Sequence, residues 1–210
     1  MTTTLLVVRH GETKWNVEGR MQGHLDSDLD TSGVEQADAV GRRLAGERID
    51  GVISSDLGRT VATARGITAH TRHEIRTDAR LRERHLGIFQ GLTGTEAALR
   101  HAHDWRRFKE RDPEHDLHGG ETLRQFSARC VECVNDLAAR QPRATLLVVT
   151  HGGVLDVLFR HTTGLPLEAP RTFTLLNASL NTFEITDGMW TLLHWGDIAH
   201  LGVRDAIDDV

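Results

Sequence analysis

The sequence Leu-Leu-Val-Val-Arg-His-Gly at residues 5–11 returns as Leu-Leu-Val-Val-Thr-His-Gly at residues 146–152. Each stretch is a short apolar run, rich in β-branched residues, that ends at a histidine and a glycine. This pattern is typical of a buried strand followed by a loop. Ligands of an open parallel sheet bind beyond the carboxyl ends of its strands. We therefore expect His10 and His151 to share one pocket if the two strands are neighbours.

The rest of the chain alternates between helical and extended patterns. A helix is predicted after Asp30 and Thr31, which can cap it, and another over residues 121–139. Residues 49–54 form a further predicted strand, and residues 180–195 contain two alternating runs that suit edge strands. Alternating strands and helices build right-handed βαβ units. The predicted fold is an α/β three-layer sandwich, with helices on both faces of a mostly parallel central sheet.

The chain has 210 residues, enough for a sheet between two helical layers. We expect a single domain over residues 1–210. Between residues 85 and 120 the periodic pattern weakens, and a basic helical piece carries Trp105 and Phe108. This segment is predicted to be a lid-like excursion over the pocket.

Composition excludes several classes of partner. The 30 acidic and 25 basic side chains leave a formal charge of -5, which argues against a nucleic-acid or membrane-surface binder. Aromatic residues are only 5%, too few for the stacking surface of a single-strand binder. No run is apolar enough to span a membrane, and the first apolar run has no basic leader. A cytoplasmic protein that binds neither nucleic acid nor membranes is expected.

Cysteine and histidine spacing predicts no metal site. Cys130 and Cys133 lie in a segment of helical apolar spacing, and one such pair is only half of a zinc site. Buried thiols in a reducing compartment are the better interpretation. The histidines at residues 101–103 and 115–118 lack metalloprotease spacing and lie in polar stretches, which favours an exposed surface.

Four cationic or hydrogen-bonding side chains map to one edge of the predicted sheet. The pair Arg9-His10 ends the first strand and His151 ends its later counterpart. Arg59 lies near the first turn of a helix that Ser55 or Asp56 can cap. Arginine offers planar, bidentate donors to phosphate. Gly152 opens another helix, and a helix N-terminus also suits an anion. The pocket is therefore expected to bind a phosphoryl group.

The residues around His10 resemble the signature of the histidine phosphatase superfamily, in its phosphoglycerate mutase-like branch. Further segments resemble motifs of this family in the family's order. They are Asn16 with residues 19–23, residues 54–59, residues 81–83 with Gly87 and Gly91, residues 119–122, and residues 150–153. The ordered set is specific, whereas any one segment alone is weak. The resemblance implies a phosphoglycerate mutase-like fold.

The resemblance also implies a phosphohistidine mechanism that needs no metal and no other cofactor. His10 would be the nucleophile that becomes transiently phosphorylated. Arg9, Arg59 and His151 would hold the phosphoryl oxygens and stabilise their charge. Glu83 would protonate the leaving oxygen and then activate water.

Several secondary positions have two interpretations. Asn16, with backbone at Gln22 and Gly23, resembles family substrate contacts, but Asn in a Gly-rich loop is also an ordinary turn former. Glu121 fits a first-turn helix residue, favoured by the helix dipole, better than a catalytic group. Trp105 either lines the leaving-group pocket or packs within the lid.

Three functions stay open at this point. A metal-independent phosphatase of small phosphomonoesters is favoured, because a mutase must keep water from its phosphohistidine and the covering segment is short. The alternative is a cofactor-dependent phosphoglycerate mutase, which would need a 2,3-bisphosphoglycerate primer. A non-catalytic binding module is disfavoured, since binding alone needs no acid near the leaving group. The expected partner is a small phosphorylated metabolite, and the family resemblance allows a monomer or a homodimer.

Overall fold

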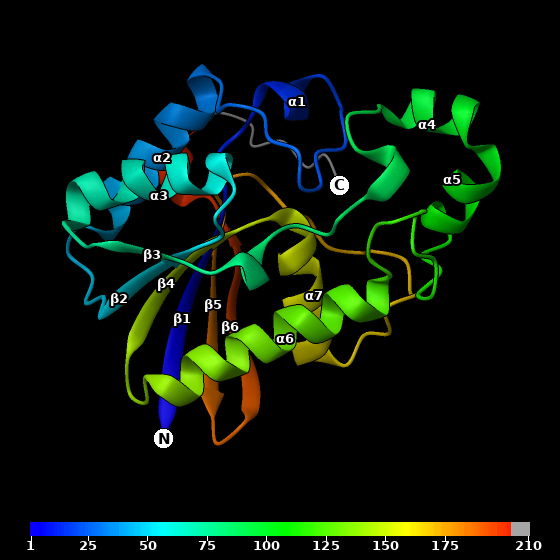
Figure 1. Cartoon of the computed structure of the whole chain (residues 1–210). Helices are drawn as coiled ribbons and strands as arrows, with labels where there is room; N and C mark the ends of the chain where they lie inside the picture. The colour runs from blue at the N-terminus through cyan, green and yellow to red at the C-terminus, as the bar shows by residue number, and fades with distance from the viewer. Residues whose placement is uncertain (203–210) are drawn as a thin grey trace.

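In the computed structural model of the chain, which describes residues 1–202, a six-stranded sheet forms the centre (Figure 1). Its strands are β1 (Thr2–Arg9), β2 (Gly51–Ser54), β3 (Ile75–Thr77), β4 (Thr145–Thr150), β5 (Leu180–Thr186) and β6 (Met189–Asp197), in the spatial order β3-β2-β4-β1-β5-β6. The first four strands in this order are mutually parallel. Strand β5 pairs antiparallel with β1, and β6 pairs antiparallel with β5. The predicted mostly parallel sheet is confirmed.

Helices cover both faces of the sheet. They are α1 (Lys14–Val17), α2 (Thr31–Leu44), α3 (Gly58–Thr71), α4 (Gly94–Arg100), α5 (Ala102–Lys109), α6 (Leu123–Arg140) and α7 (Gly152–Thr163), with short 3-10 turns η1 (Ala79–Leu81), η2 (Gly87–Phe89) and η3 (Ala199–Leu201). Leu5 and Val7 pack with α6 and α7, and Val8 packs with α2 and α3 on the opposite face (Figure 1). The three-layer prediction is therefore confirmed.

The two histidine strands are neighbours in a parallel register. Val7 lies opposite Val148 and Arg9 opposite Thr150. Both strands are buried on both faces, which explains their unbroken apolar runs. The backbone N–H of His10 donates to the carbonyl of Thr150 at 2.9 Å. The register therefore brings His10 and His151 to the same edge.

The loop after β1 is held against the start of α2 by close backbone contact. Asp30 caps α2 as predicted, and its carboxylate accepts a hydrogen bond from the backbone N–H of Gly33 at 2.7 Å. A Cβ atom on Gly33 would overlap the carbonyl of Glu12, and one on Gly11 would overlap the carbonyl of Gly33. Two glycines thus allow the helix to touch the backbone that follows His10.

Several local predictions were wrong at element boundaries. β5 lies between β1 and β6, so only β6 of that pair is an edge strand. Leu57, and not Ser55 or Asp56, is the N-cap of α3, and it makes no side-chain cap. The loop after β1 contains α1, whose capping box joins Thr13 and Asn16. The reciprocal bonds of such a box can stabilise a single helical turn that has no apolar period.

The predicted exposed surface at residues 115–118 is confirmed for His118, whose side chain is 62% exposed, but is wrong for His115. His115 and Leu117 are buried, and Leu117 packs with Phe89 and Ala97 in a small apolar cluster. This cluster belongs to the segment between residues 85 and 120, which includes α4 and α5 and stands beside the sheet (Figure 1). The prediction failed at His115 because the core of this segment uses few apolar residues from each element.

The two cysteines are buried free thiols on α6, as predicted. Burial raises the pKa of both thiols, to about 12 for Cys133. Such thiols are inert, because the thiolate is the reactive form. Among the described residues, no helix combines the length and the hydropathy needed to cross a bilayer. Residues 203–210 of the predicted single domain lie outside the described residues.

Candidate active site

A cavity of about 660 Å³ opens beyond the carboxyl ends of β1 and β4. Its wall combines site residues that the sequence predicted with side chains from the segment between residues 85 and 120. The predicted residues that line it are Arg9, His10, Asn16, Gln22, Gly23, Arg59 and Glu83. The position agrees with the rule that ligands of parallel sheets bind at this edge.

The hydrogen bond of His10 fixes which ring nitrogen carries a proton. The Nδ1 atom lies 2.8 Å from the carbonyl oxygen of Gly11. Because a carbonyl can only accept, Nδ1 must be the donor. In the neutral ring the lone pair is then on Nε2, and His10 lines the cavity. This tautomer is suited to nucleophilic attack.

Two buried arginines lie beside this imidazole. Arg9 donates from Nη1 to the carbonyl of Leu175. Arg59 donates to the carbonyls of Gly23 and Leu25 and to the carboxylate of Asp26. Burial lowers the pKa of Arg59, and Asp26 opposes this effect. Fixed carbonyl partners hold both guanidinium groups in place, so little reorganisation is needed when an anion binds.

His151 is completely buried next to His10. The centroids of the His10 and His151 rings are 5.4 Å apart. The Nε2 atom of His151 lies 2.9 Å from Oγ of Ser55, and the Nδ1 atom of His151 has no hydrogen-bond partner within residues 1–202. Burial, reinforced by the positive charges of Arg59 and Arg9, lowers its pKa well below the ordinary value. His151 is therefore neutral at physiological pH.

Glu83 occupies irregular backbone after η1. One carboxylate oxygen accepts from the N–H of Arg84 at 2.7 Å, and the other accepts from the N–H of Gly153 at 2.9 Å. A Cβ atom on Gly153 would overlap this carboxylate. The first turn of α7 therefore leaves room for Glu83 only because Gly153 has no side chain.

The predicted secondary residues separate into two groups. Asn16, Gln22 and Gly23 line the cavity, although the Asn16 side chain also completes the cap of α1 and Gln22 donates to Thr13 at 2.8 Å. Gly152 opens α7 but does not line the cavity, whereas Gly153 does. His151 also lies behind the cavity wall rather than in it.

The far wall of the cavity was largely missed by the sequence analysis. It includes the cationic side chains Arg84, Lys109, Arg111 and Arg171 and the apolar side chains Met21, Leu86, Trp105 and Phe108. Burial lowers the pKa of Arg84 to about 10. Trp105 and Phe108, which the sequence analysis placed in the predicted lid, both line the cavity, and their rings stack with centroids 5.5 Å apart. The basic composition of residues 106–111 is the signal that could have identified this wall.

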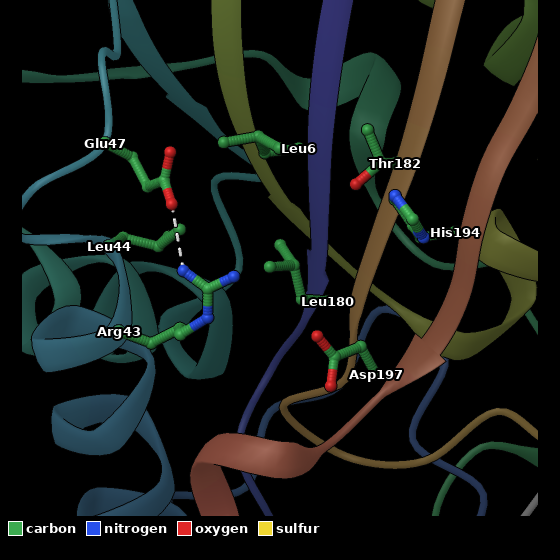
Figure 2. A pocket seen from close by; sticks show the side chains of 8 residues that line it. All are labelled: Leu6, Arg43, Leu44, Glu47, Leu180, Thr182, His194 and Asp197. Carbon is green, nitrogen blue, oxygen red and sulfur yellow. Dashed lines mark hydrogen bonds and ion pairs between the residues drawn. The ribbon is translucent and has the colours of Figure 1, made fainter.

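Figure 2 shows a second, smaller cavity of about 280 Å³, elsewhere on the sheet. It lies between the end of α2 and strands β5 and β6, and Leu6 and Leu180 form part of its wall. Its charged side chains include Arg43 and Glu47, which pair with each other at 2.9 Å. None of the predicted site residues reaches it, so the chemistry predicted from the sequence belongs to the larger cavity.

No group of three or more histidine, cysteine or acidic side chains within residues 1–202 is arranged to hold a metal ion. The larger cavity brings two arginines, Arg9 and Arg59, together with the imidazole of His10. This is the arrangement of a phosphoryl-transfer site in which side chains supply the positive charge.

Comparison with known proteins identifies the family. The family model of the histidine phosphatase superfamily (branch 1) matches residues 5–198, and the chain belongs to this family. It is 40% identical over 201 residues to phosphoglycerate mutase-like protein 4 of Arabidopsis thaliana, covering 94% of this chain and 86% of the relative. It is 37% identical over 203 residues to a metal-independent phosphoserine phosphatase of the same plant, covering 95% and 83%.

The fold agrees with solved structures of the family. Bacillus stearothermophilus YhfR superimposes with a TM-score of 0.87 at 33% identity, over 95% of this chain and 99% of that one. The predicted family and fold are therefore confirmed. The prediction of a phosphatase that needs no metal agrees with the relative whose name states this property.

Lowering the pH from neutral to about 5 is expected to destabilise the protein partly through His151. Its pKa is near 6.5 in the unfolded chain and well below that value in the folded protein. Between the two values only the unfolded chain binds the proton, so the free energy of unfolding falls as the pH drops through 6.5. One such group contributes at most about 1.4 kcal/mol per pH unit.

Urea unfolding across this pH range, for the wild type and His151→Gln, measures the effect. The free energy of unfolding of His151→Gln is expected to fall less steeply with decreasing pH than that of the wild type. His103→Gln is the control, because the side chain of His103 is exposed and lies outside the cavity. Equal slopes for the wild type and His151→Gln would contradict the assignment.

Proposed function

We propose that this protein is a phosphatase that hydrolyses small phosphomonoesters through a phosphohistidine at His10. The observation that carries the proposal is the His10 tautomer, in which the hydrogen bond to Gly11 leaves Nε2 with a lone pair in a cavity lined by Arg9 and Arg59. Glu83 lines the same cavity and completes the set of groups that hydrolysis requires.

The reaction has two steps. First, the Nε2 lone pair of His10 attacks phosphorus, the bond from phosphorus to the ester oxygen breaks, and Glu83 gives its proton to the leaving alcohol. Second, Glu83 takes a proton from water as the water oxygen attacks phosphorus. The bond from phosphorus to nitrogen then breaks, which releases phosphate and restores His10.

The charge on the phosphoryl oxygens is stabilised by fixed donors. In this proposal Arg9 and Arg59 bind these oxygens, and the neutral His151 beside His10 adds a further hydrogen-bonding group. Other contacts to the substrate would come from the side chain of Asn16 and the loop at Gln22 and Gly23, which line the cavity. The N-terminus of α7, which begins at Gly152 behind the cavity wall, is proposed to add the favourable positive end of the helix dipole.

The segment between residues 85 and 120 is proposed to act as a lid on a single domain. The segment contributes Trp105, Phe108 and Lys109 to the cavity wall. It also has its own small apolar cluster, formed by Phe89, Ala97 and Leu117. A segment with a separate cluster can move without disturbing the main core. Its wall residues would select the leaving group of the substrate.

The partner is proposed to be a small phosphorylated metabolite, with no role for nucleic acid or membranes. A cytoplasmic location is proposed because Cys130 and Cys133 are free thiols, as expected in a reducing compartment. The choice between monomer and homodimer stays a prediction. The alternative function is a phosphoglycerate mutase primed by 2,3-bisphosphoglycerate. Several relatives carry the mutase name, among them phosphoglycerate mutase-like protein 4 and the probable phosphoglycerate mutase GpmB of Proteus mirabilis.

Phosphorus NMR of the purified protein with a panel of phosphomonoesters, including 3-phosphoglycerate with its bisphosphate primer, tests the proposal. Release of free phosphate is expected, with a loss of about 10³-fold or more in His10→Ala. His103→Ala, an exposed histidine, is the control. Faster formation of 2-phosphoglycerate than of phosphate would support the mutase instead, and phosphate release unchanged in His10→Ala would contradict both mechanisms.

Closure of the lid is expected to change the fluorescence of Trp105 when vanadate, a phosphate analogue, fills the cavity. The Trp105→Phe variant should lose this change, whereas Trp190→Phe, on β6, should keep it. A vanadate-dependent change that is identical in Trp105→Phe would contradict a moving lid.

A further inference from the structure

The turn that carries Glu83 has little regular structure to hold it. Glu83 follows η1, a single 3-10 turn that packs against α6. The end of a helical turn leaves backbone carbonyls without intrahelical partners. A hydrogen-bond donor from elsewhere in the fold is therefore required to fix this backbone.

The side chain of Arg129, on α6, meets this requirement. Its Nη1 donates to the carbonyls of Arg80 at 2.7 Å and Arg82 at 3.0 Å, and its Nη2 donates to the carbonyl of Glu83 at 3.3 Å. The remaining donors form a bidentate pair with Glu121, at 2.8 Å from Nε and 2.7 Å from Nη2. All five N–H donors of the guanidinium thus have acceptors.

Glu121 ties this arginine to the next stretch of the same loop. The helix α6 begins at Leu123 after the cap Thr122, so Glu121 is not the first-turn residue that its sequence position suggested. Its carboxylate accepts from the N–H of His85 at 2.8 Å, and its own N–H donates to the carbonyl of His85. The pair therefore holds the backbone on both sides of Glu83.

The charges of the pair support each other in a partly buried place. Burial alone would lower the pKa of Arg129, but the hydrogen bonds and charge of Glu121 raise it above its ordinary value. Burial opposes ionisation of Glu121 as well, and the guanidinium of Arg129 lowers its pKa. Breaking the pair leaves a half-buried charge without its partner, which is costly.

We propose that Arg129, braced by Glu121, is a positioning residue that sets the Glu83 carboxyl at the leaving oxygen of the substrate. Neither residue lines the cavity, so both act through Glu83. This inference rests on the proposed function, because it assumes that Glu83 is the general acid.

A general acid matters most when the leaving group is a poor one. Serine and glycerol phosphates expel an alkoxide unless the oxygen is protonated, whereas p-nitrophenyl phosphate expels a stable phenolate. A displaced Glu83 therefore lowers kcat/KM for alkyl phosphates much more than for p-nitrophenyl phosphate. A general loss of structure would lower both alike.

The experiment measures kcat/KM of Arg129→Gln, Arg129→Lys and Glu121→Gln on a series of phosphomonoesters with graded leaving groups. For Arg129→Gln we expect a loss of about 10- to 100-fold on alkyl phosphates and under about threefold on p-nitrophenyl phosphate. Arg129→Lys has three donors instead of five and should lose less than Arg129→Gln, with the same dependence on the leaving group. Glu121→Gln provides the same test if Arg129→Gln does not fold.

Two control variants make the outcomes distinguishable. Arg124→Gln, on the same helix, loses an exposed ion pair with Glu114 and should keep wild-type kinetics. Glu83→Gln should show the steepest dependence on the leaving group. One outcome would overturn the positioning role alone. In it, the Arg129 and Glu121 variants lose kcat/KM equally on all substrates, whereas the loss in Glu83→Gln depends steeply on the leaving group. If the loss of kcat/KM in Glu83→Gln does not depend on the leaving group, Glu83 is not the general acid, and this inference fails with it.

Discussion

The parallel register of β1 against β4 is the constraint on which the rest of the site depends. Because Arg9 lies opposite Thr150, the residues that follow, His10 and His151, leave the sheet side by side. Both strands are buried on both faces, so a shift of register would move apolar side chains between the two helical layers. The packing of the core and the geometry of the site are therefore fixed by the same pairing.

Around this pair the protein collects groups that are difficult to bury. Arg9 and Arg59 are nearly inaccessible, and carbonyl oxygens hold their guanidinium groups instead of water. The burial that keeps His151 neutral also strengthens the attraction between the arginines and an anion. In the proposed function such a site favours a phosphoryl group, because the cost of desolvating the arginines has already been met during folding.

The sequence predicted the elements that are decided by strong local patterns. The strands before His10 and His151, the cap of α2 at Asp30 and the buried thiols of α6 all follow from periodicity or capping chemistry. The same patterns brought the main chemical residues to one cavity, because parallel strands end at one edge.

The parts that escaped prediction depend on contacts between distant segments. The lid wall around Phe108 has few apolar residues in each element, and its cluster forms only when α5 meets Leu117 and Phe89. The start of α3 lacks a side-chain cap altogether. The sequence position of Glu121 favoured a first-turn helix residue stabilised by the helix dipole. Its partner in the structure is Arg129, which lies eight residues later on α6. Sequence spacing carries no direct signal for such pairs.

The central claim is that the phosphoryl group passes through His10. Rapid mixing with a phosphomonoester, followed by an alkaline quench that preserves phosphohistidine and by mass spectrometry of the peptides, tests it most directly. The account predicts a transient phosphoryl group on the peptide that contains His10, which accumulates further in Glu83→Gln if its breakdown is slowed more than its formation. A phosphoryl group found instead on His151 or Ser55 would contradict it.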